Sequence, residues 1–198
     1  MSRVGVFGGT FDPVHHGHLI MAQEAVARLK LDRMVFVAAN RPSHKRAPDL
    51  ADVEHRIAML RLAVKGNESF EVSRIEADRG GFSYTVNTLE TLHQAGGDDL
   101  FFLMGQDSLE DFARWVKPDR ILELARLVVV PRGEGDMGSL PPSLRRRVTY
   151  VKPPRIGICS TEIRRRLKRG LPVRYWIPDL VLRYLTRHGL YGTGNRRR

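Results

Sequence analysis

The chain has 198 residues, a formal net charge of +11 and one cysteine. A single cysteine excludes an internal disulfide and is typical of the reducing cytoplasm. No apolar run approaches the roughly 20 residues that span a bilayer, and no signal peptide is apparent, so we expect a soluble cytoplasmic protein. We expect one domain at residues 1–191 and a basic, disordered tail at 192–198.

Apolar strand patterns and helical patterns alternate along the chain. Strands are expected from Arg3 onward and at about 34–39, 70–73, 99–104, 127–130 and 148–151. Helices are expected at about 19–29, 52–64, from Ser83 or Thr85 to His93, and at 107–115, 160–169 and 178–188. A short helix is expected from Pro118, and loops at 40–49, 73–84 and 134–142. This alternation predicts an α/β fold, a single-domain Rossmann-like doubly wound parallel sheet with strand order 3-2-1-4-5 and a C-terminal helical part.

A glycine-rich turn follows the first strand, in the string Gly-Gly-Thr-Phe-Asp-Pro-Val-His-His-Gly-His that begins at Gly8. Parallel sheets bind ligands at the carboxyl ends of their strands. Gly8 and Gly9 would let a ligand approach the backbone, and N–H groups of the turn and helix start can hold phosphate oxygens. His15 and His18 add movable hydrogen-bond donors, so we predict a phosphate-binding site here.

Several other sites are disfavoured by this loop. The glycine spacing does not fit the dinucleotide fingerprint, and no Gly-Lys-Ser/Thr of a P-loop is present. A zinc site would need a third ligand, and the single cysteine, Cys159, is remote in sequence. The remaining alternative is that the two histidines are ordinary solvated or hydrogen-bonded loop residues.

The full string, with its His-x-Gly-His unit, resembles the opening of the bacterial nicotinate-nucleotide adenylyltransferases, of the HxGH nucleotidyltransferase superfamily. The resemblance implies that His15 and His18 hydrogen-bond the phosphates of ATP during adenylyl transfer. It also implies that the preceding residues line the ATP site, with Thr10 shared with nicotinate mononucleotide: Gly8, Gly9, Thr10 and Phe11.

The loop after the second strand, Pro42-Ser43-His44-Lys45, is similar to the family's Pro-Pro-His-Lys, with Ser43 as a departure. The resemblance implies that His44 and Lys45 bind nicotinate mononucleotide and that Lys45 also serves catalysis as a mobile point charge. The alternative is that Lys45 is a solvated loop lysine.

Residues 73–86 are similar to the family's second signature, which binds nicotinate mononucleotide through Ser83, Tyr84 and Thr85. A helix N-terminus offers N–H donors and a positive dipole end, and so favours a pyridine carboxylate over a neutral carboxamide. The alternative for Ser83 and Thr85 is simple N-capping. Asn87 stands where the family usually has Asp.

The string Gly105-Gln-Asp107-Ser follows the fourth strand and resembles a family motif whose aspartate binds ribose hydroxyls of the nucleotide. A carboxylate accepts two hydrogen bonds from a cis-diol. Without the resemblance, Asp107 would be an N-cap. Trp115 matches the family tryptophan that stacks on the pyridine ring, and would otherwise be a core residue.

The string Ile-Cys-Ser-Thr-Glu-Ile-Arg at residues 158–164 resembles a further family motif, with Cys159 where serine is usual. Ser160, Thr161 and Arg164 would place hydroxyls, helix N–H groups and a guanidinium around a triphosphate. We expect Cys159 to be a small buried residue.

The resemblance implies adenylyl transfer from ATP to nicotinate mononucleotide, giving deamido-NAD and pyrophosphate, with Mg²⁺ carried by the ATP phosphates and no metal site of the protein. Neither nucleic acid nor a membrane is required, and homo-oligomerisation is left open. Three alternatives stay open: a sister enzyme that adenylylates phosphopantetheine or the amide mononucleotide, a nucleic-acid-binding protein suggested by basic runs in the C-terminal third, and an inactive nucleotide-binding regulatory domain.

Overall fold

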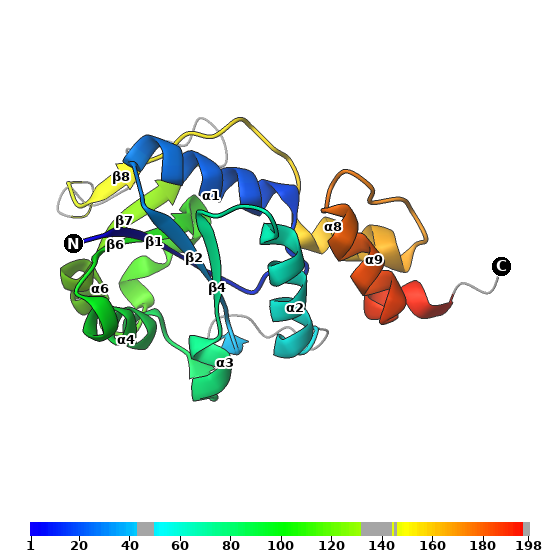
Figure 1. Cartoon of the computed structure of the whole chain (residues 1–198), viewed down its shortest axis with the longest axis horizontal. Helices are drawn as coiled ribbons and strands as arrows, with labels where there is room; N and C mark the ends of the chain where they lie inside the picture. Colours follow the sequence, from blue (N-terminus) through cyan, green and yellow to red (C-terminus); the bar gives the residue numbers. More distant parts are fainter. Residues whose placement is uncertain (43–49, 132–143, 145, 196–198) are drawn as a thin grey trace.

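The computed structural model describes residues 1–42, 50–131, 144 and 146–195. Its centre is a six-stranded sheet with the order β4-β2-β1-β6-β7-β8, in which every neighbouring pair is parallel (Figure 1). The predicted Rossmann-like sheet and its order 3-2-1-4-5 are confirmed, and the strand predicted at 148–151 is present as the sixth strand, at one edge of the sheet. The strands are β1 (Arg3–Gly9), β2 (Arg33–Ala38), β4 (Phe70–Ser73), β6 (Asp99–Gly105), β7 (Ala125–Val130) and β8 (Val148–Tyr150).

Helices cover both faces of the sheet because its central strands are apolar on both sides. In β6, Phe101 and Leu103 face one core, whereas Leu100, Phe102 and Met104 face the other. The first core is closed by α1 (His16–Leu29), α2 (Val53–Val64), α8 (Ser160–Lys168) and α9 (Asp179–Arg187). The second is closed by α4 (Thr85–Gly96), α5 (Gln106–Glu110) and α6 (Pro118–Leu124).

Short elements are where the structure differs from the sequence prediction. The predicted loop at 73–84 contains α3 (Ile75–Arg79) and β5 (Phe82–Ser83), and β5 pairs with β3 (Arg41–Pro42). Elements this short carry too few residues for a periodic pattern. The prediction of one helix that reaches Trp115 is wrong, because α5 ends at Glu110 and a 3₁₀ turn, η1 (Phe112–Arg114), follows. The predicted connection at 134–142 lies outside the described residues.

The C-terminal segment folds back on the preceding helices. Residues 190–195 form η3 (Leu190–Asn195), in which Thr193 is buried and its Oγ1 lies 3.0 Å from Leu185 O and 2.9 Å from Leu190 O. Of the predicted tail, residues 192–195 are therefore part of this turn, whereas 196–198 lie outside the described residues. None of the described helices is long and apolar enough to cross a membrane.

The excess of basic over acidic residues lies in one part of the chain. Residues 1–151 contain 20 Lys and Arg against 20 Asp and Glu, whereas residues 152–198 contain 13 against 2. The second range includes α8, α9 and η3, which lie together at one end of the molecule (Figure 1). The sheet and its flanking helices are thus close to neutral, and the C-terminal helical part is strongly basic.

Arg56 is the largest of the fully buried side chains, at 1% exposure. From α2, its guanidinium donates to four carbonyl oxygens: Ala51 O at 2.8 Å, Thr10 O at 3.0 Å, Ala39 O at 2.7 Å and Asn40 O at 3.2 Å. Burial lowers the pKa of Arg56 from its ordinary value. Five N–H donors in a rigid fork satisfy backbone oxygens from three segments at once, so this side chain sets the spacing of the loops that follow β1 and β2.

We expect Arg56→Leu to lower the free energy of unfolding by about 3 kcal/mol, because the buried carbonyl oxygens lose their donors. Urea unfolding measures the loss. Arg61→Leu is the matched control, since Arg61 is an exposed arginine of the same helix, and it should change the free energy by less than about 0.5 kcal/mol. Equal effects of the two substitutions would contradict the structural role of Arg56.

Candidate active site

The two motif histidines begin α1, directly after the loop that follows β1. His15 is the N-cap residue, and its backbone N–H lies 3.3 Å from Nδ1 of His18. The two rings stack with centroids 3.7 Å apart. Because Nδ1 of His18 accepts a hydrogen bond, the proton of its neutral ring resides on Nε2. The capping contact therefore makes Nε2–H of His18 a hydrogen-bond donor of defined position.

The glycines of the motif make room for neighbouring side chains. A Cβ on Gly17 would lie 2.9 Å from Nδ1 of His15, so this position must be glycine if the histidine ring is to stay where it is. Gly8 and Gly9, expected in the turn, are the last residues of β1, and a Cβ on Gly9 would lie 3.1 Å from the Phe11 ring. Phe11 is 1% exposed, which leaves its backbone rather than its ring for contact with a ligand.

The start of α8 meets the same loop. Ser160 donates from Oγ to Pro13 O at 2.9 Å, and Arg164 donates from Nη1 to Asp12 O at 2.6 Å. Thr161 lies exposed in the first turn. The N-termini of α1 and α8 thus converge on one loop, and each contributes N–H groups and a positive dipole end. The structure brings the histidine pair His15 and His18 and the α8 residues Ser160 and Arg164 to the same loop, although the two pairs are more than 140 residues apart in sequence.

The prediction that Cys159 is buried is wrong. Its side chain is exposed, and the residue is the N-cap of α8. The N-cap precedes the helix and has extended backbone, so its side chain is not directed by the helix face that packs on the core.

The carboxyl end of β6 lies at the same edge of the sheet as the β1 loop, because β1 and β6 are parallel neighbours. Gly105 is the N-cap of α5, and a Cβ there would meet no other atom within 4 Å. Asp107 is exposed in the first turn of α5. The N-cap alternative for Asp107 is therefore wrong, and the residue follows the carboxyl end of β6, at the switch point between β1 and β6, where such sheets bind ligands.

The start of α4 is tied to the end of β2. Oγ of Ser83 accepts from the Asn40 N–H at 2.9 Å, and Nδ2 of Asn40 donates to Gly81 O at 3.0 Å. The N-cap of α4 is Tyr84, with no side-chain cap, and Thr85 is the first helical residue. The N-capping alternative for Ser83 and Thr85 is therefore wrong. The hydrogen bonds place the amino end of α4 beside the strand that neighbours β1.

Trp115 lies after η1 and is half-buried. Its ring centroid is 6.0 Å from that of Phe102 and 5.6 Å from that of Phe112. The interpretation of Trp115 as a core residue therefore holds for part of the side chain, and the exposed remainder stays a candidate for contact with a pyridine ring. His44 and Lys45 lie outside the described residues, as does Ser43.

Sequence reasoning missed three residues that organise this site: Asp12, Arg56 and Tyr191. Asp12 is 2% exposed, and its Oδ1 accepts from the Ala51 N–H and from the Tyr191 hydroxyl. Burial raises the pKa of Tyr191, and the negative charge of Asp12 raises it further. Arg56 could have been singled out as a cation within the apolar pattern of its helix, whereas no local pattern marks Tyr191.

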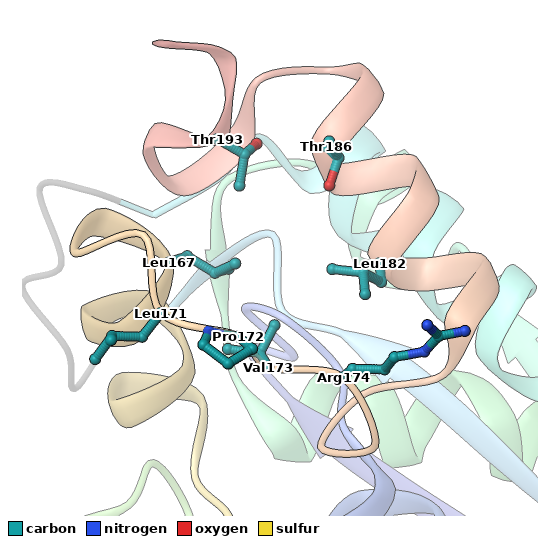
Figure 2. Close-up of a pocket in the computed structure, with 8 residues that line it drawn as sticks. All are labelled: Leu167, Leu171, Pro172, Val173, Arg174, Leu182, Thr186 and Thr193. Carbon is teal, nitrogen blue, oxygen red and sulfur yellow. The ribbon is translucent and has the colours of Figure 1, made fainter. Parts of the chain in front are cut away.

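A separate pocket of about 270 Å³ lies between α8, α9 and η3 (Figure 2). None of the residues predicted for the site lines it. Its lining is mostly apolar and consists of Leu167, Leu171, Pro172, Val173, Arg174, Leu182, Thr186 and Thr193.

Among the described residues, no group of three or more His, Cys, Asp or Glu side chains is arranged to hold a metal ion. The groups that meet at the loop after β1 are hydrogen-bond donors, helix N-termini and a guanidinium, which together favour an anion.

Comparison with known proteins agrees with this geometry. The cytidylyltransferase-like family matches residues 6–166. A Roseiflexus sp. protein named "Probable nicotinate-nucleotide adenylyltransferase" is 45% identical over 95% of this chain and 97% of its own length. A Thermus thermophilus protein of the same name is 46% identical over 96% and 99%.

Solved structures share the fold at lower sequence identity. Plasmodium falciparum nicotinic acid mononucleotide adenylyltransferase complexed with NaAD superposes with a TM-score of 0.79 at 17% identity, covering 96% of this chain and 98% of its own. The structure named "Putative Nicotinate-nucleotide Adenylyltransferase from Vibrio parahaemolyticus" superposes with a TM-score of 0.71 at 20% identity, covering 97% of this chain and 96% of its own. The chain therefore belongs to the cytidylyltransferase-like family and, within it, to the nicotinate-nucleotide adenylyltransferases.

Proposed function

We propose that this chain transfers the adenylyl group of ATP to nicotinate mononucleotide, forming deamido-NAD and pyrophosphate in NAD biosynthesis. The observation that carries the proposal is the meeting of the His-x-Gly-His loop with the start of α8, where Ser160 and Arg164 bond to the loop backbone. The relatives with more than 40% identity over nearly the whole chain carry the name of this activity.

The reaction needs positioned anions more than it needs a base. A phosphate oxygen of nicotinate mononucleotide attacks the α-phosphorus of ATP in line, a new P–O bond forms, and the bond to the bridging oxygen breaks to release pyrophosphate. The second pKa of a phosphate monoester is about 6, so the nucleophile is already largely ionised at neutral pH. The protein lowers the barrier by holding the two substrates together and by stabilising charge that builds on the transferring group.

The residues divide this work by their chemistry. His18 donates from Nε2–H to the triphosphate, because its other ring nitrogen, Nδ1, already accepts the His15 N–H. The His15 ring is a second donor. Arg164 supplies a fixed positive charge, and the first turn of α8, with Ser160 and Thr161, supplies donors. Lys45, outside the described residues, is proposed to add a mobile charge.

Mg²⁺ enters this proposal as part of the substrate. A hard cation is held by phosphate oxygens and water in many nucleotide sites. The cation bound to ATP neutralises part of the triphosphate charge. Asp107 would hold the nucleotide ribose through its carboxylate oxygens.

The mononucleotide is proposed to lie between the start of α4 and Trp115. The helix N-terminus at Thr85 favours an anionic pyridine carboxylate over a carboxamide, and the exposed part of the indole offers a face for the ring. Location in the cytoplasm stays a prediction from the sequence, and the oligomeric state is left open.

Pyrophosphate release by the purified protein with ATP and Mg²⁺ tests the activity. We expect release with nicotinate mononucleotide and at least tenfold less with nicotinamide mononucleotide, because only the acid form satisfies the donors at the start of α4. Phosphopantetheine should give none. Equal release with both pyridine forms would contradict the role of the helix start, and no release with any of the three would contradict the proposed reaction.

His18→Ala should lower kcat by about 100- to 1,000-fold, since it removes a donor aimed at developing charge, while circular dichroism and thermal unfolding report an intact fold. His16→Ala is the matched control: the residue adjoins the pair, but its contact to Trp176 O is made by its backbone N–H, which alanine keeps. Near wild-type turnover of His18→Ala would refute the assigned role.

The basic C-terminal part should draw in both anionic substrates. We expect kcat/KM for ATP to fall roughly three- to tenfold as ionic strength rises from about 0.02 to about 0.3 M, with kcat little changed, because salt screens the field. The double variant Arg183→Gln/Arg187→Gln on α9 should show a shallower salt dependence. The control Lys30→Gln/Lys65→Gln removes the same charge from exposed positions in the neutral part and should keep the wild-type slope; identical slopes for both pairs would exclude steering by this region.

A further inference from the structure

The C-terminal segment reaches the loop that precedes α1. Tyr191, in η3, donates its hydroxyl hydrogen to Oδ1 of Asp12, although the two residues are 179 positions apart in sequence. Asp12 is 2% exposed. A carboxylate this deeply buried must be satisfied by donors, and the last turn of the described chain supplies one of them.

Asp12 is joined at the same time to the arginine of the proposed triphosphate site. Its backbone oxygen accepts from Nη1 of Arg164 at 2.6 Å, and its Oδ2 lies 3.7 Å from the same nitrogen. Oδ1 also accepts from the Ala51 N–H at 3.2 Å. One residue therefore connects the His-x-Gly-His loop, the entry to α2, α8 and the C-terminal segment, and it holds one nitrogen of a guanidinium that is 26% exposed.

The backbone at both ends of the Tyr191–Asp12 contact has an uncommon conformation. Tyr191 has φ 55°, and Phe11, the neighbour of Asp12, has φ 48°. Residues with a Cβ seldom adopt positive φ, and they keep it where surrounding contacts hold them there. The hydroxyl bond is one such contact. A tyrosine phenol is protonated at neutral pH in any case, and burial and the Asp12 charge raise the pKa of Tyr191 further.

We propose that Tyr191 is a positioning residue, which holds Asp12 and through it orients Arg164 toward the triphosphate of ATP. The inference rests on the proposed function, and it assigns a role in ATP binding to a residue that lies beyond the family match at residues 6–166. In this role Tyr191 does not act on the reacting atoms; it fixes Asp12, whose backbone oxygen accepts from Arg164 and whose carboxylate lies beside the same nitrogen.

Tyr191→Phe tests this, because it removes one hydroxyl and keeps the ring. Affinity is measured by calorimetry with an ATP analogue whose α,β-bridging oxygen is replaced by methylene. We expect binding about tenfold weaker and kcat/KM for ATP about tenfold lower, while KM for nicotinate mononucleotide stays within about twofold. Tyr184→Phe is the matched control, since its hydroxyl contacts His55, away from the loop, and both constants should stay at wild-type values.

A double-mutant cycle separates positioning from general destabilisation. In an Arg164→Gln background, Tyr191→Phe should weaken analogue binding by less than about twofold, because the group that it orients is gone. Wild-type affinity of the single variant, or the full tenfold effect in the Arg164→Gln background, would overturn the inference. A wild-type protein that binds the analogue but releases no pyrophosphate would contradict the proposed function instead, and the binding cycle would still decide the role of Tyr191.

Discussion

The buried guanidinium of Arg56 is the constraint on which the site edge of the sheet depends. It is one cation shared by carbonyl oxygens that follow β1 and β2, including Thr10 O and Asn40 O. Backbone oxygens at strand ends have no partner in the sheet, and burying them without donors is costly. By satisfying them, Arg56 fixes the distance between two loops. Asn40 then holds Ser83 through its backbone N–H, so the position of α4 follows from the same arginine.

A second buried group extends this order toward α8. Asp12 receives Ala51 N–H from the entry to α2, Tyr191 from the C-terminal turn, and Arg164 at its backbone oxygen. The loop after β1 is thus held at two points: Arg56 donates to Thr10 O, and Asp12 accepts from the surrounding segments. Buried hydrogen-bond networks are rigid, and a rigid set of donors suits phosphoryl chemistry, in which catalysis comes from positioning and charge stabilisation.

The positive charge of the chain is concentrated in the C-terminal helices that reach the site. The sheet region balances its charges and buries an apolar core on each face, whereas the C-terminal helices carry the excess of arginine and lysine. These helices pack on the core through residues such as Ile163 and Val181, so the basic part is fastened to the sheet on the side where α8 enters the site. Anionic substrates would meet a positive field on that approach.

Local pattern in the sequence determined most of the fold: the order of strands and helices, the Rossmann-like class and the His-x-Gly-His turn, because periodicity and turn chemistry depend on near neighbours. It did not determine that Gly8 and Gly9 end a strand, that Cys159 is exposed, or that Tyr191 reaches Asp12. Only the tertiary structure decided these points, since each depends on what lies across space from the residue. Buried polar partners far apart in sequence leave no periodic signal, and their energies arise only when the chain has closed around them.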